Sequence, residues 1–310
     1  MRRPLGAIVV VASLVVAAVA LGGCEPDKPP KNPRAPACPP PPEPERQVAV
    51  VGTIGRLHMA ESRYPISKLG DVMASFKPDV VLLAMRVDPF REGHYEDASF
   101  EMTYVAALAK NRGVPVEAID WFKDRELAAA PPPVEPSDEI EIAKREAEVL
   151  LRPKLYTFEQ ANGEELAQKV FLASNAEARH RSGNAQATRR MAWMQHLATD
   201  AVMRHDRPKK VLAFVDVFDR PGIDLALRAI GYFPKDPVAI TKASSEVVVA
   251  DLPPEVLAQY KTQLERIRGR IEKTSGEERA FWQDRQRVLE LVVEKRASCC
   301  VTQTALSAPP

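Results

Sequence analysis

Cysteine is scarce in this chain, with 4 among 310 residues, at Cys24, Cys38, Cys299 and Cys300. Cys24 ends an apolar N-terminal segment, so the rest of the chain holds three cysteines, which cannot all pair with one another. Adjacent cysteines such as Cys299 and Cys300 seldom bridge each other without strain. The sequence therefore predicts no structural disulfide framework, and it leaves open a reactive thiol near the C-terminus.

A large net charge is also absent, because 43 basic residues face 42 acidic ones. Arg2 and Arg3 belong to the N-terminal segment, so the 41 basic residues that follow almost balance the acidic ones. Proteins that bind nucleic acid through phosphate contacts carry a clear basic excess. The balance predicts that nucleic acid is not a partner.

Several well-known catalytic motifs are missing as well. The sequence contains no G-x-S-x-G, no P-loop, no H-E-x-x-H, no C-x-x-C and no dinucleotide-binding fingerprint. These patterns mark the commonest hydrolase, nucleotide and zinc sites. A function of one of those classes would need a site that these motifs do not describe.

What is present begins with an N-terminal targeting segment, residues 1–24. Two arginines precede an apolar run from Ala7 to Leu21 that only Ser13 interrupts. About 15 apolar residues are typical of a secretory signal and short for a membrane-spanning helix of about 20. The sequence Leu21-Gly22-Gly23-Cys24 resembles the lipobox of bacterial lipoproteins, and this resemblance implies that Cys24 is lipidated. An uncleaved anchor helix is the alternative.

Both alternatives place the chain at a membrane in the bacterial cell envelope. The membrane is then a partner, which the chain contacts through its N-terminal segment. Glu25 follows Cys24 where lipoproteins retained at the inner membrane commonly carry aspartate, so the resemblance favours the outer membrane. Residues 25–46 contain ten prolines and almost no apolar side chains. Such a segment favours extended polyproline II and does not fold. We expect a disordered tether between the lipid and the folded part.

Residues 47–250 predict an α/β domain with a mainly parallel sheet flanked by helices. Runs of β-branched and apolar residues indicate buried strands, and amphipathic segments between them supply the long crossovers that parallel strands need. Charged and proline-rich sequence from about 128 to 207 predicts a helical insertion. The expected strands are 48–54, 80–83, 116–119, 211–215 and 246–250.

Residues 251–297 predict a helical hairpin, followed by a disordered tail over 298–310. Apolar residues recur at steps of three and four from Leu257 to Ile271, and Ser275 with Glu278 forms a capping-box pattern that begins a second helix. The apolar stripes could pack on the rest of the chain or on a partner. Packing within the chain is favoured because apolar stripes usually face a core.

Polar residues at the expected strand ends are the candidates for chemistry. They are His58, Glu61, Arg86, Asp88, Asp120, Asp216 and Asp219, and Glu101 lies in the first turn of a helix. Imidazole and carboxylate groups that converge at one sheet edge could hold a divalent metal. The competing interpretation is structural: Asp216 and Asp219 cap a helix, Glu101 complements a helix N-terminus, and His58 lies in a surface loop.

Two further groups have the same pair of interpretations. A basic cluster of Arg179, His180, Arg181, Arg189 and Arg190 could contact phosphates, or it could form a solvated helix face, which is favoured. Trp193 is flanked by Met191 and Met194, and this grouping is more typical of a core than of a ligand site.

The order of these segments resembles the superfamily of the TraB/PrgY proteins, the Tiki proteases, the haem-binding lipoprotein ChaN and the erythromycin esterases. The likeness spans about residues 47–232. It rests on four short segments, which are Gly52-Thr53-Ile54-Gly55, Lys77 to Ala84, Phe100-Glu101 and Asp216 to Asp219. The resemblance implies the α/β fold and, for members with a full set of site residues, metal-assisted hydrolysis.

The departures from this pattern lie at the functional positions. Gly55 stands where the superfamily has its first histidine, Ala84 where the first glutamate falls, and Asp219 where the last histidine falls. Glu101 alone is retained, and Ala84 can neither coordinate a metal nor transfer a proton. The resemblance therefore implies a relative that kept the scaffold and lost the catalysis.

Three hypotheses follow for the function. The first is a lipid-anchored envelope protein whose non-catalytic α/β domain binds a small molecule or an envelope protein that the sequence does not identify. The second is a metal-dependent hydrolase with a shifted ligand set of His58, Glu101 and Asp219, in which Glu101 has the catalytic role and a divalent metal is the cofactor. The third is a structural protein that docks a partner through the C-terminal hairpin.

Overall fold

The computed structural model describes residues 45–121, 137–139, 141, 142, 145, 157–180, 186–241 and 252–295. All of them belong to the larger of the two units of the chain, Pro44–Pro310. The targeting segment with Cys24, most of the tether, the expected strand 246–250 and the tail lie outside the described residues. In the described part, no helix is long and apolar enough to cross a membrane.

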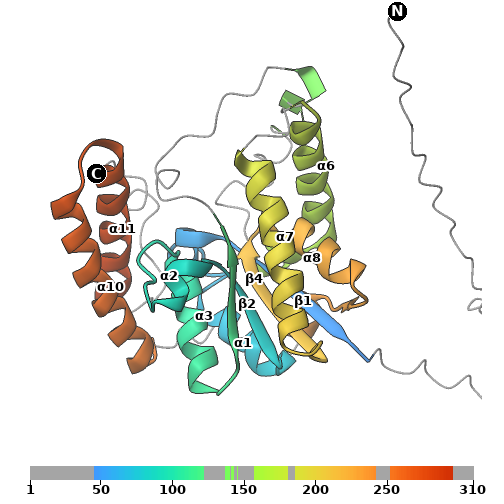
Figure 1. Ribbon diagram of the computed structural model, residues 1–310, viewed down its shortest axis with the longest axis horizontal. Coiled ribbons are helices and arrows are strands. Elements are labelled where there is room, and N and C mark those ends of the chain that lie inside the picture. Colours follow the sequence, from blue (N-terminus) through green and yellow to red (C-terminus); the bar gives the residue numbers. More distant parts are fainter. Residues whose placement is uncertain are drawn as a thin grey trace, which may run out of the picture. The chain divides into compact units, whose positions relative to one another are not determined.

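The described chain forms an α/β fold around a parallel sheet of five strands, as the sequence predicts (Figure 1). The strand order is β3-β2-β4-β1-β5, and every pair is parallel. Three strands extend the expected ranges by one to three residues, β1 is shifted by one residue toward the N-terminus, and the two-residue β5 is new. The strands are β1 (Gln47–Thr53), β2 (Val80–Arg86), β3 (Val116–Asp120), β4 (Lys210–Asp216) and β5 (Phe233–Pro234).

Helices cover both faces of the sheet. Helices α1 (Ser67–Phe76) and α3 (Phe100–Asn111) pack on the face that contains Ala49 and Val51 of β1. Helices α7 (Gln186–Arg204) and α8 (Arg220–Ala229) pack on the opposite face, against Val48 and Val50. Because successive side chains of a strand point to opposite faces, β1 is buried along its whole length.

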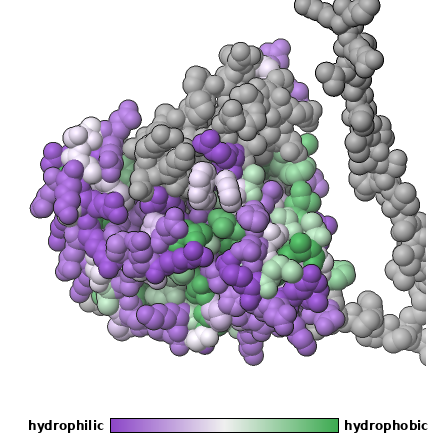
Figure 2. All heavy atoms as spheres, in the orientation of Figure 1, coloured by the Kyte–Doolittle hydropathy of each residue, from purple (hydrophilic) through white to green (hydrophobic). Residues whose placement is uncertain are grey.

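The C-terminal helices α10 (Pro254–Lys273) and α11 (Gly276–Lys295) form the predicted hairpin, in which α10 packs on α3 and α11 packs on α10. The Tyr260 hydroxyl donates to the Phe100 carbonyl at 2.8 Å, and the Gln263 amide donates to the Thr103 hydroxyl at 2.9 Å. The apolar stripe, which includes Tyr260, Ile267 and Trp282, lies in the same core as α3. The outer surface of the hairpin is hydrophilic (Figure 2).

The described part of the insertion is mainly helical, as expected, and includes α5 (Phe158–Asn162), α6 (Glu164–His180) and α7. Helix α5 contacts β1, and α7 contacts β3 and α8. Three short helices were not expected: the 3₁₀ helix η1 (Gly55–Met59), α2 (Val87–Arg91) and α9 (Pro237–Ile240).

Gly52 near the end of β1 marks a close approach of three segments. A Cβ atom there would lie 3.1 Å from the Val217 Cα and 3.2 Å from the Ala161 carbonyl oxygen. The Asn162 side chain accepts the Gly52 N–H at 2.9 Å, and the Tyr64 hydroxyl donates to the Gly52 carbonyl at 2.8 Å. These bonds tie α5 and the loop before α1 to the strand end where the polar residues gather.

Candidate functional site

The carboxyl ends of β1, β2, β3 and β4 surround a polar cavity of about 260 Å³, which we call the edge cavity. The chain leaves β1 toward α1 on one face of the sheet, and it leaves the adjacent β4 toward α8 on the other. Ligands of open α/β sheets bind at such a switch point. The cavity is lined by Thr53, Gly55, Ala84, Met85, Arg86, Asp97, Ala98, Ser99, Glu101, Met102, Asp120, Arg190, Asp216 and Arg285.

Glu101 is the most unusual residue of the edge cavity. Its side chain extends from the first turn of α3, and the residue is only 2% exposed. Oε1 accepts a hydrogen bond from the Thr53 hydroxyl at 3.4 Å, whereas Oε2 is buried without a hydrogen-bond partner. Burial raises the pKa of Glu101, and hydrogen bonds with its own amide, Ser99 and Thr53 oppose that rise only in part.

Asp216 lies at the end of β4 and supplies the second carboxylate of the edge cavity. Solvent reaches it, and its Oδ1 accepts the Phe218 N–H at 2.9 Å, so the side chain closes the turn after the strand as the structural interpretation expected. The surrounding protein raises the pKa of Asp216, and the nearby charge of Glu101 adds to the rise. Two carboxyl groups that disfavour ionisation therefore line one cavity.

Arg190 of α7 joins two strand-end carboxylates. Its guanidinium donates twice to Asp120, at 2.7 Å through both Nε and Nη2, and twice to Asp219, at 3.0 and 3.3 Å. Burial by itself lowers the pKa of Arg190, but the charges of Asp219 and Asp120 raise it overall. The prediction that Arg190 belongs to a solvated basic face is wrong, because this arginine neutralises buried acids.

The expected roles of Asp219 change with this geometry. Asp219 is the N-cap residue of α8, yet its side chain makes no capping hydrogen bond, because Arg190 occupies both carboxylate oxygens. The prediction that Asp219 caps the helix with its side chain is therefore wrong. As a metal ligand it would have to give up these bonds.

Two further arginines line the edge cavity. Arg86, at the end of β2, forms a buried ion pair with Asp97. Arg285 comes from α11, donates through Nη1 to the Ala98 carbonyl, and has a buried Nε without a partner. Burial lowers the pKa of Arg285, whereas Asp97, Glu101 and Asp284 oppose that change. The hairpin therefore contributes a cation to a cavity at the end of the sheet.

His58 is buried at 2% exposure, so the prediction of a surface loop residue is wrong. Its Nδ1 lies 2.9 Å from the Tyr64 carbonyl oxygen, and its Nε2 lies 3.3 Å from the Ile54 amide nitrogen. Burial lowers the pKa of His58 to about 4, although the hydrogen bond to Tyr64 opposes this change. The neutral ring uses both nitrogens to hold the turn after β1.

The proposed ligand set of His58, Glu101 and Asp219 is not assembled in the described residues. Within that part of the chain, no three His, Cys, Asp or Glu side chains are placed to hold one metal ion. The ring nitrogens of His58 face backbone groups, and Asp219 is bound by Arg190. Of the three, only Glu101 lines the edge cavity.

The other strand-end residues have separate partners. Glu61 binds Arg63 at 2.7 Å, and Asp88 lies in α2.

Trp193, which was expected in the core, is 42% exposed, and its ring lies 5.5 Å from that of Trp121. Of the group Met191, Trp193 and Met194, only Met194 is fully buried. Sequence patterns missed Arg285, because no local spacing connects the hairpin to a strand end.

No family model, no curated protein and no solved structure matches this chain. The function must therefore be argued from the residues of the edge cavity themselves.

Proposed function

We propose that this chain is a lipid-anchored protein of the bacterial cell envelope whose α/β domain binds a small polar ligand in the edge cavity. One observation carries the proposal: Glu101 is buried, lines the cavity, and keeps Oε2 without a hydrogen-bond partner. A buried polar atom without a partner lowers stability by about 1–3 kcal/mol. A ligand that donates a hydrogen bond to Oε2 would remove this cost.

The charges around the cavity indicate the chemistry of the ligand. Arg86 neutralises Asp97, and Arg190 neutralises Asp120 and Asp219. Glu101 and Asp216 stay available beside Arg285. Two carboxyl groups against one guanidinium favour a ligand that presents mainly hydrogen-bond donors, namely hydroxyl or amino groups.

A purification experiment tests this proposal. The full chain is extracted from its native envelope in mild detergent and analysed by native mass spectrometry, alongside Glu101→Ala. The wild type should carry a small molecule of defined mass that the variant lacks. Glu255→Ala, on the exposed start of α10, is the control and should keep it. Equal spectra for wild type and Glu101→Ala would sink the proposal.

A second candidate is hydrolysis, favoured by the two carboxyl groups with raised pKa in one cavity. A protonated Glu101 could act as a general acid while ionised Asp216 acts as a general base, or the reverse. This version of the hydrolase hypothesis uses residues that line one cavity, unlike the shifted set of His58, Glu101 and Asp219. A bell-shaped pH profile of turnover that loses one limb in Glu101→Gln would support it.

The proposed anchor and the proposed ancestry rest on the sequence. Cys24 within its lipobox, followed by the proline-rich tether, supports a lipidated N-terminus and the outer membrane. The likeness to TraB/PrgY, Tiki, ChaN and the erythromycin esterases supports a degenerate member of that superfamily, with Glu101 as the retained position. The structural alternative, a partner docked on the hairpin, has less support because the apolar stripe lies in the core with α3.

A further inference from the structure

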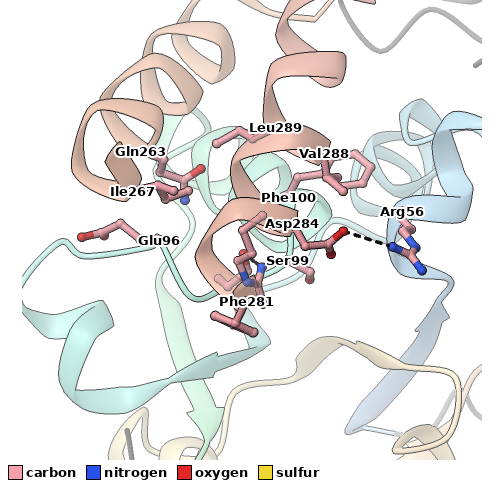
Figure 3. Close-up of a pocket in the computed structure, with 12 residues that line it drawn as sticks. Arg56, Glu96, Ser99, Phe100, Gln263, Ile267, Phe281, Asp284, Val288 and Leu289 are labelled. Carbon is pink, nitrogen blue, oxygen red and sulfur yellow. Dashed lines mark hydrogen bonds and ion pairs between the residues drawn. The ribbon is translucent and has the colours of Figure 1, made fainter. Parts of the chain in front are cut away.

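A second cavity, which we call the hairpin cavity, lies between the N-terminus of α3 and the helices α10 and α11. Its volume is about 300 Å³. The apolar residues of its lining are Ala98, Phe100, Ile267, Phe281, Val288 and Leu289. Figure 3 shows Phe100 coming from the start of α3, and Ile267, Phe281, Val288 and Leu289 coming from the two hairpin helices. Six of its twelve lining residues are apolar, against five of the fourteen that line the edge cavity, Gly55 included.

The two cavities share a wall. Ala98, Ser99 and Arg285 line both of them. The Arg285 guanidinium lies 5.1 Å from the centre of the Phe281 ring and donates to the Ala98 carbonyl. Its buried Nε has no hydrogen-bond partner. Arg285 therefore lies at the boundary of the two cavities together with Ala98 and Ser99, and it retains an unused donor there.

An ion pair crosses the hairpin cavity on the other side. Arg56 of η1 lies 3.6 Å from Asp284 of α11, and both side chains are solvent-exposed (Figure 3). The Glu96 side chain points away from the apolar residues in the same view and pairs with Arg266 at 3.6 Å. The hairpin cavity thus combines apolar side chains with a few polar and charged groups, as ligand pockets commonly do.

We infer that the two cavities together bind one amphipathic ligand, with its hydroxyl- or amine-bearing head in the edge cavity and its apolar part in the hairpin cavity. The inference rests on the proposed function, because it assigns the ligand of the same site. Each cavity alone is at the lower limit of the volumes of small-molecule sites, about 300–1,000 Å³, whereas a joint site falls within that range.

The apolar part has a physical reason to enter the hairpin cavity. Phe100, Ile267 and Leu289 belong to the buried core and also line this cavity, so the side of each that borders the open space lacks partner atoms. An alkyl chain or ring of the ligand that fills the space would supply those contacts and would itself be removed from water. Burying one methylene raises affinity about fourfold.

Two pairs of probes test the inference on the full chain by isothermal titration calorimetry. The hydroxyl pair is methyl and hexyl β-glucoside, and the amine pair is methylamine and hexylamine. We expect the hexyl compound of at least one pair to bind the wild type at least about tenfold more tightly than its methyl counterpart. The pair that responds identifies the head group as hydroxylated or amino. If neither hexyl compound binds better than its methyl counterpart, the inference is wrong.

Variants locate the gain in affinity. Val288→Trp fills the hairpin cavity, and Val288→Phe fills it with less risk to folding, so both should reduce the hexyl advantage to below about threefold. Gln283→Trp adds the same ring at an exposed position of α11 and should leave the advantage unchanged. Melting temperatures confirm that each variant is folded. An advantage that survives in a folded Val288 variant overturns the inference.

The failures of the two proposals are distinguishable. If Glu101→Gln weakens both members of a pair while the Val288 variants change nothing, the edge cavity binds the head and only the joint site is wrong. If the Val288 variants remove the hexyl advantage and Glu101→Gln changes neither affinity, the hairpin cavity binds the tail alone. The second result contradicts both the joint ligand and the role of Glu101.

Discussion

At the scale of single residues, most charged side chains around the edge cavity are paired with a side chain of opposite charge. Arg190 is the residue on which most of this balance depends, because it holds Asp120 and Asp219, which are both buried. Without it, two carboxylates would repel each other in a low-dielectric site. The cavity therefore depends on these ion pairs for its structure. Glu101 is not one of the carboxylates that Arg190 binds.

Replacing Arg190 with alanine should destabilise the domain by about 3 kcal/mol, since breaking a buried ion pair leaves uncompensated charges. Urea unfolding at pH 7 measures the change. Arg228→Ala is the matched control: it breaks the exposed pair with Asp224, at 3.5 Å, and should cost less than about 1 kcal/mol. Similar losses in the two variants would show that Arg190 is an ordinary surface arginine.

At the scale of elements, the turn after β1 is fixed by groups from distant parts of the sequence. Asn162 of α5 accepts the Gly52 N–H, and it donates to the Phe158 carbonyl at 3.1 Å and to the Tyr64 hydroxyl at 3.4 Å. Tyr64 in turn packs edge-on against His58, with ring centres 4.5 Å apart. This buried network positions the strand end that carries Thr53.

Asn162→Ala should lower the free energy of unfolding by about 2 kcal/mol, because the buried Gly52 N–H loses its acceptor. Thr262→Ala, on the exposed face of α10, removes a local hydrogen bond to the Ala258 carbonyl and should change stability by less than about 0.5 kcal/mol. Chemical denaturation of both variants measures the difference. A change at Asn162 as small as that at Thr262 would mean that the network does not hold the turn.

Most strands and helices could be predicted because the sequence patterns that indicate them are local. Buried runs such as Val80 to Leu83 and the stripe from Leu257 to Ile271 need only neighbouring residues to be recognised. The two-residue β5 carries no such run, and the burial of His58 depends on Tyr64 and on the helices packed around it. Arg190 stands in a basic cluster whose composition resembles a solvated face, and its partners Asp120 and Asp219 are 70 and 29 residues away. Long-range pairs of this kind leave no pattern in one sequence.

At the scale of the whole molecule, the proposed lipid on Cys24 would tether the proposed ligand-binding domain to a membrane. The prediction for the anchor is that Cys24→Ser moves the protein from the membrane fraction to the soluble fraction of the envelope, because one residue carries all the lipid. Cell fractionation with immunoblotting measures the distribution. Cys38→Ser, in the tether, is the control and should remain in the membrane fraction. A Cys24→Ser protein that stays in the membrane would indicate an uncleaved anchor helix instead.

On the proposed function, Glu101 is kept at a cost to stability because it serves a ligand. Its ordinary pKa is 4.5 and burial raises it in the fold. Below pH 4.5 both the folded and the unfolded chain hold the proton, so the penalty is absent. As the pH rises toward the raised pKa, only the unfolded chain releases the proton readily, and the folded state loses stability.

Glu101→Gln keeps an oxygen for the Thr53 hydroxyl but cannot ionise. The decisive measurement is the free energy of unfolding of the wild type and Glu101→Gln at pH 4 and pH 8, without ligand. We expect wild type and variant to have similar stabilities at pH 4, and the variant to be more stable by about 1 kcal/mol or more at pH 8. A variant that is less stable than the wild type at pH 8 would contradict this expectation, because Glu101 would then be a structural residue.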